Sequence, residues 1–234
     1  MSEVVPPPQP STAGRTLFGG GQQLSEKVAA YVREGIMVGQ FRAGEYVRTE
    51  HLATELGVSP TPVREGLMIL HSEGTIRWVP RKGYRVVPIT ASDVADIFKV
   101  QAFIAGELAA RAAVELTDES RGAIERWQEQ LESADTAGKA DEVDRLNFEI
   151  HRTINKASKS LRMGSLLNLT VNFVPLRFFG SIPGWSAASV HDHTDILDAL
   201  RDRDPEAARL AMTAHIEHIG RLLVTHLAAQ NILT

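Results

Sequence analysis

Residues 52–74 read LATELGVSPTPVREGLMILHSEG and predict two helices joined by a very short turn. A helix over 49–56 stops at Gly57, where the missing side chain lets the backbone turn sharply. Ser59 then offers a side-chain oxygen that can cap a second helix, which ends at Gly74. The inner side of this second helix carries the apolar residues Val63, Leu67, Ile69 and Leu70. The pattern predicts a helix-turn-helix.

The segments on either side complete a small domain. An earlier helix begins near Leu24, repeats apolar residues at helical spacing and ends at Gly39. A hairpin is predicted from Ile76 and Trp78, the turn over 80–83 and a return strand over 84–87. Three helices followed by a hairpin are the outline of a winged helix-turn-helix. We assign it to residues 23–89.

The rest of the chain, residues 90–234, predicts an antiparallel bundle of about six helices, so the fold class is mainly α. Thr90 and Asp93 form an N-cap pair at the start of its first helix. Asp204 followed by Pro205 starts the last one. The predicted helices cover 90–116, 117–137, 141–157, 161–179, 188–202 and 205–229, with a loop over 181–186.

Composition narrows the classes of function. The 234 residues include no cysteine, which excludes disulfides, thiolate ligands and a cysteine nucleophile and fits a reducing cytoplasm. No apolar run reaches about 18 residues and no signal peptide begins the chain, so we expect a cytoplasmic protein without a membrane partner.

Residues 1–22, rich in Pro, Gly, Ser and Gln, predict a disordered tail. The net charge of −4 means that DNA binding would need a local basic face.

The N-terminal end of the second helix carries side chains suited to DNA. Ser59, Thr61 and Arg64 lie there, and this end of a helix-turn-helix enters the major groove. Hydroxyls can bond phosphates or base edges, and an arginine can reach O6 and N7 of guanine together. The alternative is a winged helix used only for protein contacts.

The same stretch resembles the DNA-binding motif of the GntR family of bacterial regulators. The family pattern is close to LAxxLGVSRTPVREAL, and this chain has LATELGVSPTPVREGL. The segment PRKGYRV resembles the RxGxxV turn of the family's wing, where the glycine lets the backbone approach the minor groove. The resemblance implies contacts to double-stranded operator DNA from Ser59, Thr61, Pro62, Arg64, Lys82 and Gly83. Pro60 replaces a DNA-contacting arginine, and Gly66 replaces an alanine, which should cost about 1 kcal/mol of helix stability at most.

Three of the eight histidines fall at inward-looking positions of three predicted helices. They are His151, His193 and His215, and Asn147 shares a helix face with His151 because it lies four residues earlier. Three imidazoles and one oxygen can converge on a metal in a bundle core. Histidines on apolar helix faces are also common as hydrogen-bonded core residues, so the spacing leaves both interpretations open.

The helical half resembles the FCD domain of the fatty-acid-responsive branch of GntR regulators. The matching segments are NFEIH at 147–151, DHTDILDAL at 192–200 and RDPEAARLAMTAH at 203–215. The resemblance implies a divalent metal, zinc or nickel, surrounded by Asn147, His151, His193 and His215. A carboxylate of the effector would complete the coordination sphere. Asn147 replaces the aspartate found in many members.

Two further residues are candidates for effector binding. Many family members have arginine where Gln101 stands, and that arginine would anchor an acidic effector. With Gln101 in its place, a carboxylate would rely on the metal or on Arg177. The alternative is that this chain prefers a different class of ligand.

We therefore expect a homodimeric repressor that places two recognition helices in successive major grooves of a pseudo-palindrome. A small organic acid would release it from its operator by binding the two arrangements of the dimer differently. One alternative is a helical domain that only dimerises, with its histidines packed as core. A metal-dependent hydrolase would need a general base beside an open metal position. The chain has no HExxH motif and no paired carboxylates at useful spacing, so we expect no enzyme.

Overall fold

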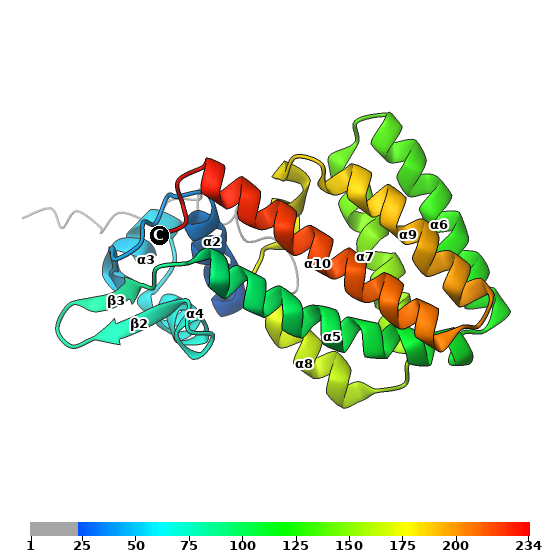
Figure 1. Cartoon of the computed structure of the whole chain (residues 1–234). Helices are drawn as coiled ribbons and strands as arrows, with labels where there is room; N and C mark the ends of the chain where they lie inside the picture. Colours follow the sequence, from blue (N-terminus) through cyan, green and yellow to red (C-terminus); the bar gives the residue numbers. More distant parts are fainter. Residues whose placement is uncertain (1–22) are drawn as a thin grey trace, which may run out of the picture. The chain divides into compact units, whose positions relative to one another are not determined.

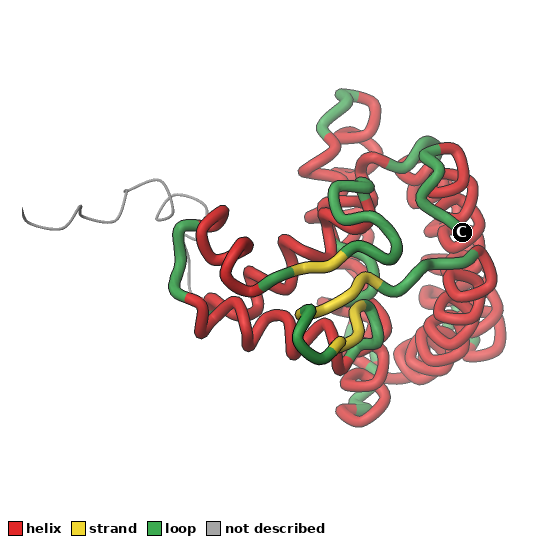
Figure 2. Tube along the Cα trace, turned by 90° about the vertical axis from the view of Figure 1, so that its left-hand side faces the viewer, coloured by secondary structure: helices red, strands yellow, loops and turns green. Residues whose placement is uncertain are grey.

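The computed structural model describes residues 23–234, except for the side chains of Leu176 and Arg177. The chain divides into two compact units, Met1–Pro88 and Ile89–Thr234, which are described separately. The tail predicted for the first 22 residues lies outside the described part. Within that part, every strand belongs to the first unit and is yellow in Figure 2.

The first unit combines three helices with a small antiparallel sheet (Figure 1). Its elements are α2 (Leu24–Met37), β1 (Tyr46–Val47), α3 (Thr49–Leu56), α4 (Pro60–Ser72), β2 (Ile76–Val79) and β3 (Gly83–Val86). The strand order is β1-β3-β2, and Trp78 of β2 lies opposite Tyr84 of β3. The predicted winged helix-turn-helix is confirmed. Strand β1 was not predicted, because two residues are too short to show an alternating pattern.

The turn between α3 and α4 differs from the prediction in one detail. Gly57 ends α3 in the left-handed conformation, with φ of 65°. Ser59 is the N-cap of α4, but its side chain makes no capping hydrogen bond, so that part of the prediction is wrong. The amides that usually donate to a cap belong to the second and third helical residues. The third is Pro62, which has no N–H.

Gly66 lies where α4 packs against α2. A Cβ atom at this position would lie 2.7 Å from the carbonyl oxygen of Ser25 and 2.9 Å from Cβ of Val28. Val28 and Leu67 are fully buried beside it. The glycine is therefore needed for close helix contact, and the expectation that it only weakens α4 was incomplete.

The second unit is helical throughout its described residues, apart from connecting loops and a single bridge between Ile89 and Leu233. Its helices are α5 (Ala91–Glu115), α6 (Asp118–Thr136), α7 (Ala140–Ala157), α8 (Leu161–Val171), the 3-10 helix η1 (Leu176–Ser181), α9 (Trp185–Arg201) and α10 (Pro205–Ala229). The predicted mainly α fold is confirmed. Among the described residues, no helix is both long and apolar enough to cross a membrane.

Helices α5 and α10 pack along each other's length in opposite directions (Figure 1). Glycines make this close approach possible at two points. A Cβ atom on Gly106 would lie 2.5 Å from Oγ1 of Thr213, and one on Gly220 would lie 2.7 Å from Cβ of Phe98. Neither position has room for a side chain, so the two backbones are held closer than larger residues would allow.

The helix boundaries follow local chemistry. Thr90 and Asp93 form the predicted capping box of α5, and Asp204 accepts hydrogen bonds from two backbone amides at the start of α10. The predicted helix over 161–179 is wrong, because α8 ends at Val171 and η1 follows. Pro175 lies between them, and proline disfavours helical backbone at the residue before it.

Candidate functional site

The outer face of α4 carries the predicted DNA-binding residues. Ser59, Thr61 and Arg64 are exposed, Pro62 is partly exposed, and the inner face of the helix is buried. The Arg64 side chain makes no ion pair or hydrogen bond with any residue that the structure describes. Its guanidinium is thus free to bind an external partner. Pro60, which stands where the family pattern has an arginine, is also exposed and offers no donor.

The wing joins β2 to β3 and carries Lys82 and Gly83. Lys82 is exposed, with its Nζ 5.6 Å from the centre of the Tyr46 ring. Gly83 has a φ of 94°, and a Cβ atom there would lie 3.0 Å from the carbonyl oxygen of Val47. Glycine is therefore required at this position, because the backbone conformation is left-handed and strand β1 leaves no room for a side chain.

Sequence reasoning missed Arg48, an exposed residue at the N-cap of α3. A Cβ atom on Gly83 would lie 3.8 Å from Cγ of Arg48, so this arginine stands beside the wing. Arg77 and Arg81 of the wing are exposed as well, and Arg81 has a φ of 63°. None of these three side chains pairs with a described residue. Arg48 could be placed only once β1 had been found beside β3.

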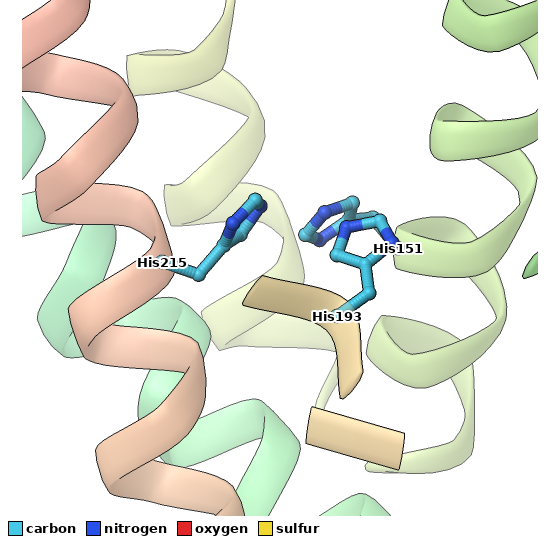
Figure 3. A group of neighbouring side chains, drawn as sticks. All are labelled: His151, His193 and His215. Atoms are coloured by element: carbon cyan, nitrogen blue, oxygen red, sulfur yellow. The ribbon is translucent and has the colours of Figure 1, made fainter. Parts of the chain in front are cut away.

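In the helical unit, three histidines from three helices meet in the interior (Figure 3). His151 comes from α7, His193 from α9 and His215 from α10. One nitrogen of each ring lies within 4.8 Å of the other two, and the ring centroids are 4.9 to 5.3 Å apart. Burial lowers the pKa of His151 to about 3 and holds that of His193 well below its usual value. Both rings are therefore neutral near pH 7 and can act as metal ligands.

Gln128 of α6 sets the tautomer of His193. The Gln128 amide nitrogen donates to Glu132 and to the carbonyl oxygen of Val190, so its oxygen is free to accept. That oxygen, Oε1, lies 2.9 Å from Nδ1 of His193, which must carry the proton. The other ring nitrogen, Nε2, is left unprotonated, buried and without a hydrogen-bond partner.

Asp192 plays the same part for His215. Its Oδ2 accepts a hydrogen bond from Nδ1 of His215 at 3.2 Å and from Nδ1 of His218 at 2.8 Å. Burial acts to raise the pKa of Asp192, but these two hydrogen bonds hold it below its usual value. A carboxylate behind a metal-binding imidazole fixes its orientation and strengthens it as a ligand.

Asn147 lies one helical turn before His151 and faces the same cavity. Its Oδ1 is buried without a hydrogen-bond partner. A buried amide oxygen and the Nε2 of His193 are therefore both unsatisfied in one part of the bundle. Three imidazoles and an amide oxygen are suitable ligands for a divalent metal such as zinc or nickel. The residues present thus fit a metal ion.

A cavity of about 540 Å³ adjoins the histidines, between α5, α7, α8, α10, η1 and the start of α9. His151 and His215 form part of its wall, so a molecule in the cavity can reach a metal held there. Much of the wall is apolar, with contributions from Phe98, Phe148, Leu167, Phe179, Trp185 and Ile219. Such a wall suits a small molecule with an apolar body and few polar groups.

Of the two predicted effector-binding residues, the structure describes the side chain of Gln101 but not that of Arg177. Gln101 lines the cavity but is only 5% exposed, and its amide nitrogen donates to the carbonyl oxygen of Thr170 at 2.9 Å. It therefore ties α5 to α8. Arg177 belongs to η1, and its side chain lies outside the part of the chain that the structure describes.

Comparison with known proteins gives a match for each unit. Residues 24–86 match the family described as "Bacterial regulatory proteins, gntR family", and residues 96–218 match the FCD domain. Relatives of known name align over most of the chain. The "Probable D-xylose utilization operon transcriptional repressor" of Paenarthrobacter nicotinovorans is 31% identical over 199 residues, which is 81% of this chain and 85% of that protein.

Two further likenesses agree with these matches. The "HTH-type transcriptional repressor RspR" of Escherichia coli (strain K12) is 25% identical over 202 residues, covering 85% of this chain and 88% of the relative. The solved structure of E. coli McbR/YncC superposes with a TM-score of 0.65 at 21% identity, covering 90% of this chain and all of the other. This structural likeness shows that the fold is shared.

Proposed function

Because the chain belongs to the gntR family of bacterial regulatory proteins and carries an FCD domain, we propose that it is a homodimeric repressor whose operator binding is controlled by a small carboxylate at a metal centre. Two relatives bear the name of repressor, which supports that direction of control. Operator binding would place the protein in the bacterial cytoplasm, where the chromosome is.

The observation that carries the DNA-binding role is the outer face of α4. Arg64 is exposed and unpaired among the described residues, while Val63 and Leu67 on the other face are fully buried. We propose that α4 enters the major groove, with Arg64 on a guanine and with Ser59 and Thr61 on phosphates or base edges. Lys82 and Gly83 of the wing would contact the minor groove. Pro62 would position the start of the helix at the DNA surface.

The metal centre would use His151, His193 and His215, with Asn147 as an oxygen ligand. Zinc with only the three imidazoles keeps one position open, and six-coordinate nickel with all four ligands keeps two. The bound ion would supply a positive charge that attracts a carboxylate. Gln128 and Asp192 would hold His193 and His215 in the orientation and the tautomer that coordination needs.

Control of DNA binding would follow from the dimer. A homodimer places two copies of α4 one helical turn of DNA apart, so the operator would be a pseudo-palindrome. A carboxylate in the cavity can shift the equilibrium only by binding the DNA-competent and DNA-free arrangements with different affinities. We propose that it favours the DNA-free arrangement.

The decisive experiment is a gel-shift titration of the full-length protein on the intergenic DNA beside its own gene. It uses fixed salt and excess competitor DNA, since phosphate contacts make the affinity depend on salt. Arg64→Ala should weaken specific binding by about 1–3 kcal/mol. Arg162→Ala removes an exposed arginine of α8 and should change nothing. Equal operator affinity for Arg64→Ala and the wild type would contradict the assigned role.

The metal is tested separately by elemental analysis after dialysis and by adding a chelator to the protein-DNA complex. Retention of about one zinc or nickel ion per chain, lost in His193→Ala, would support the metal centre. The protein could instead retain no metal and bind its operator with the same affinity whether or not chelator is present. That result would support the simpler function, in which the helical domain only dimerises and the histidines are core residues.

A further inference from the structure

One wall of the cavity is a polar stripe along α7. Asp144, Asn147, His151 and Asn155 all line the cavity at intervals of three or four residues, so they share one face of the helix. A helix rises 1.5 Å per residue, which puts Asp144 about 10 Å along the axis from His151. The stripe fixes the order in which a bound molecule meets these groups.

Asp144 has no counter-charge among the side chains that the structure describes. Its Oδ1 is buried without a hydrogen-bond partner. A Cβ atom on Gly180 would lie 3.3 Å from Oδ2, so the carboxylate occupies space that a glycine of η1 leaves open. Burial, together with the nearby charge of Asp141, raises the pKa of Asp144 to about 6. An unpartnered buried oxygen on a cavity wall is a place for a donor group of a ligand.

The cations of the cavity wall lie toward the other end of the stripe. Arg152 is paired with Glu149, and Lys159 is paired with Glu115. Arg152 is eight residues beyond Asp144 on the same helix, a rise of about 12 Å. Lys156 also lines the cavity, still further along α7, and Lys159 follows the end of that helix, so these cations lie too far from Asp144 to neutralise it. The half of the cavity between His151 and Asp144 offers an acid at its far end.

We propose that the effector is an aliphatic amino acid with its amine at the far end of the chain, so that the carboxylate meets the metal centre and the ammonium group meets Asp144. This rests on the proposed function, in which a carboxylate binds beside His151 and His215. Phe98, Phe148 and Ile219 of the wall would cover the methylene groups between the two ends. A chain of about six carbon atoms spans most of the distance along α7.

The test compares three probes that share one carbon skeleton. Hexanoate, 6-hydroxyhexanoate and 6-aminohexanoate are titrated calorimetrically into the full-length, zinc-loaded protein. The ammonium probe should bind about tenfold or more tightly than hexanoate, because a charge-assisted hydrogen bond replaces an unpartnered oxygen. Asp144→Asn should remove this preference while hexanoate binds as before. Asp141→Asn, an exposed acid one turn earlier, should keep it.

The outcomes separate this inference from the proposed function. Equal affinities for hexanoate and 6-aminohexanoate, or a preference that survives Asp144→Asn, would overturn the role of Asp144 and leave a metal-bound carboxylate intact. A hydroxyl probe that binds as tightly as the amine would overturn the requirement for a cation. If zinc is retained but none of the three acids binds, both this inference and the carboxylate effector fail, while DNA binding stands on its own experiment.

Discussion

Oε1 of Gln128 lies 2.9 Å from Nδ1 of His193, in the buried interior of the helical unit. Gln128 is 4% exposed, and its amide nitrogen is already committed to Glu132 and to the Val190 carbonyl. The glutamine cannot turn over without losing those bonds. It thereby keeps the proton on one nitrogen of His193 and leaves the other nitrogen facing the histidine cluster.

Replacing this glutamine should weaken metal binding without removing a ligand. Gln128→Leu leaves Nδ1 of His193 unpaired and frees its tautomer, and losing such a partner typically reduces metal affinity about 10–100-fold. Competition against a chromophoric chelator measures the change. Gln130→Leu, at an exposed position of the same helix, is the matched control and should bind metal normally. Unchanged affinity in Gln128→Leu would mean that the tautomer is set elsewhere.

Asp144 should make the metal-free protein less stable at high pH. Its pKa is raised from 3.8 to about 6, so the folded state binds more protons than the unfolded state between these values. The stability that the protonated group contributes is present below pH 3.8 and lost as pH rises through 6. Because Asp144 is half-buried, Asp144→Asn should gain only about 1 kcal/mol in the free energy of unfolding at pH 8.

Urea unfolding of the chelator-treated protein at several pH values measures this difference between Asp144→Asn and the wild type. The difference should shrink toward zero near pH 4. Glu129→Gln removes an exposed acid of α6 and should show no such pH-dependent gain. A gain for Asp144→Asn that is the same at pH 4 and pH 8 would rule out titration of Asp144 as its cause.

Gly66→Ala should destabilise the protein, although alanine is the better helix former. The added Cβ would approach the Ser25 carbonyl oxygen to 2.7 Å, and overpacking of this kind costs about 1–3 kcal/mol. Gly164→Ala in α8 is the matched control, because nothing lies within 4 Å of the added atom. That change should raise the free energy of unfolding by about 0.5–1 kcal/mol. Changes of the same sign in both variants would contradict the packing argument.

Arg48 should contribute to DNA binding without contributing to sequence choice. An exposed arginine beside the wing is placed to contact phosphate, so Arg48→Ala should weaken binding about equally on operator and random DNA. The slope of log affinity against log salt should also fall by about one. A loss confined to the operator would instead assign Arg48 to base contacts.

Most of the fold could be predicted from the sequence, because the signals that begin and end a helix lie within a few residues of each other in the chain. Thr90 with Asp93 and Asp204 with Pro205 mark two helix starts within a few residues of chain. The predictions failed where the structure of a segment depends on a contact with a distant part of the chain, or where two local preferences compete. Strand β1 exists only because it pairs with β3, and the break after Val171 depends on Pro175 outweighing an apolar run that otherwise suits a helix.

The candidate ligands of the metal centre could be predicted from the sequence, but not all the residues that hold those ligands by hydrogen bonds. His151, His193 and His215 stand in three recognisable segments, whereas Gln128 comes from a helix whose sequence gives no hint of its partner. Asp144 was within reach of sequence reasoning, since it shares a helix face with Asn147 and His151. Asp192, next to His193, carried a similar signal. What sequence could not supply is the lack of a partner for the Asp144 carboxylate.

The glycine contacts between α5 and α10 bear on how strain would spread from the metal centre. His215 lies on α10 between Thr213 and Gly220, and both of these positions are locked against α5. We therefore expect a displacement of α10 at His215 to carry α5 with it. Such a displacement would reach the end of the helical unit where Ile89 pairs with Leu233.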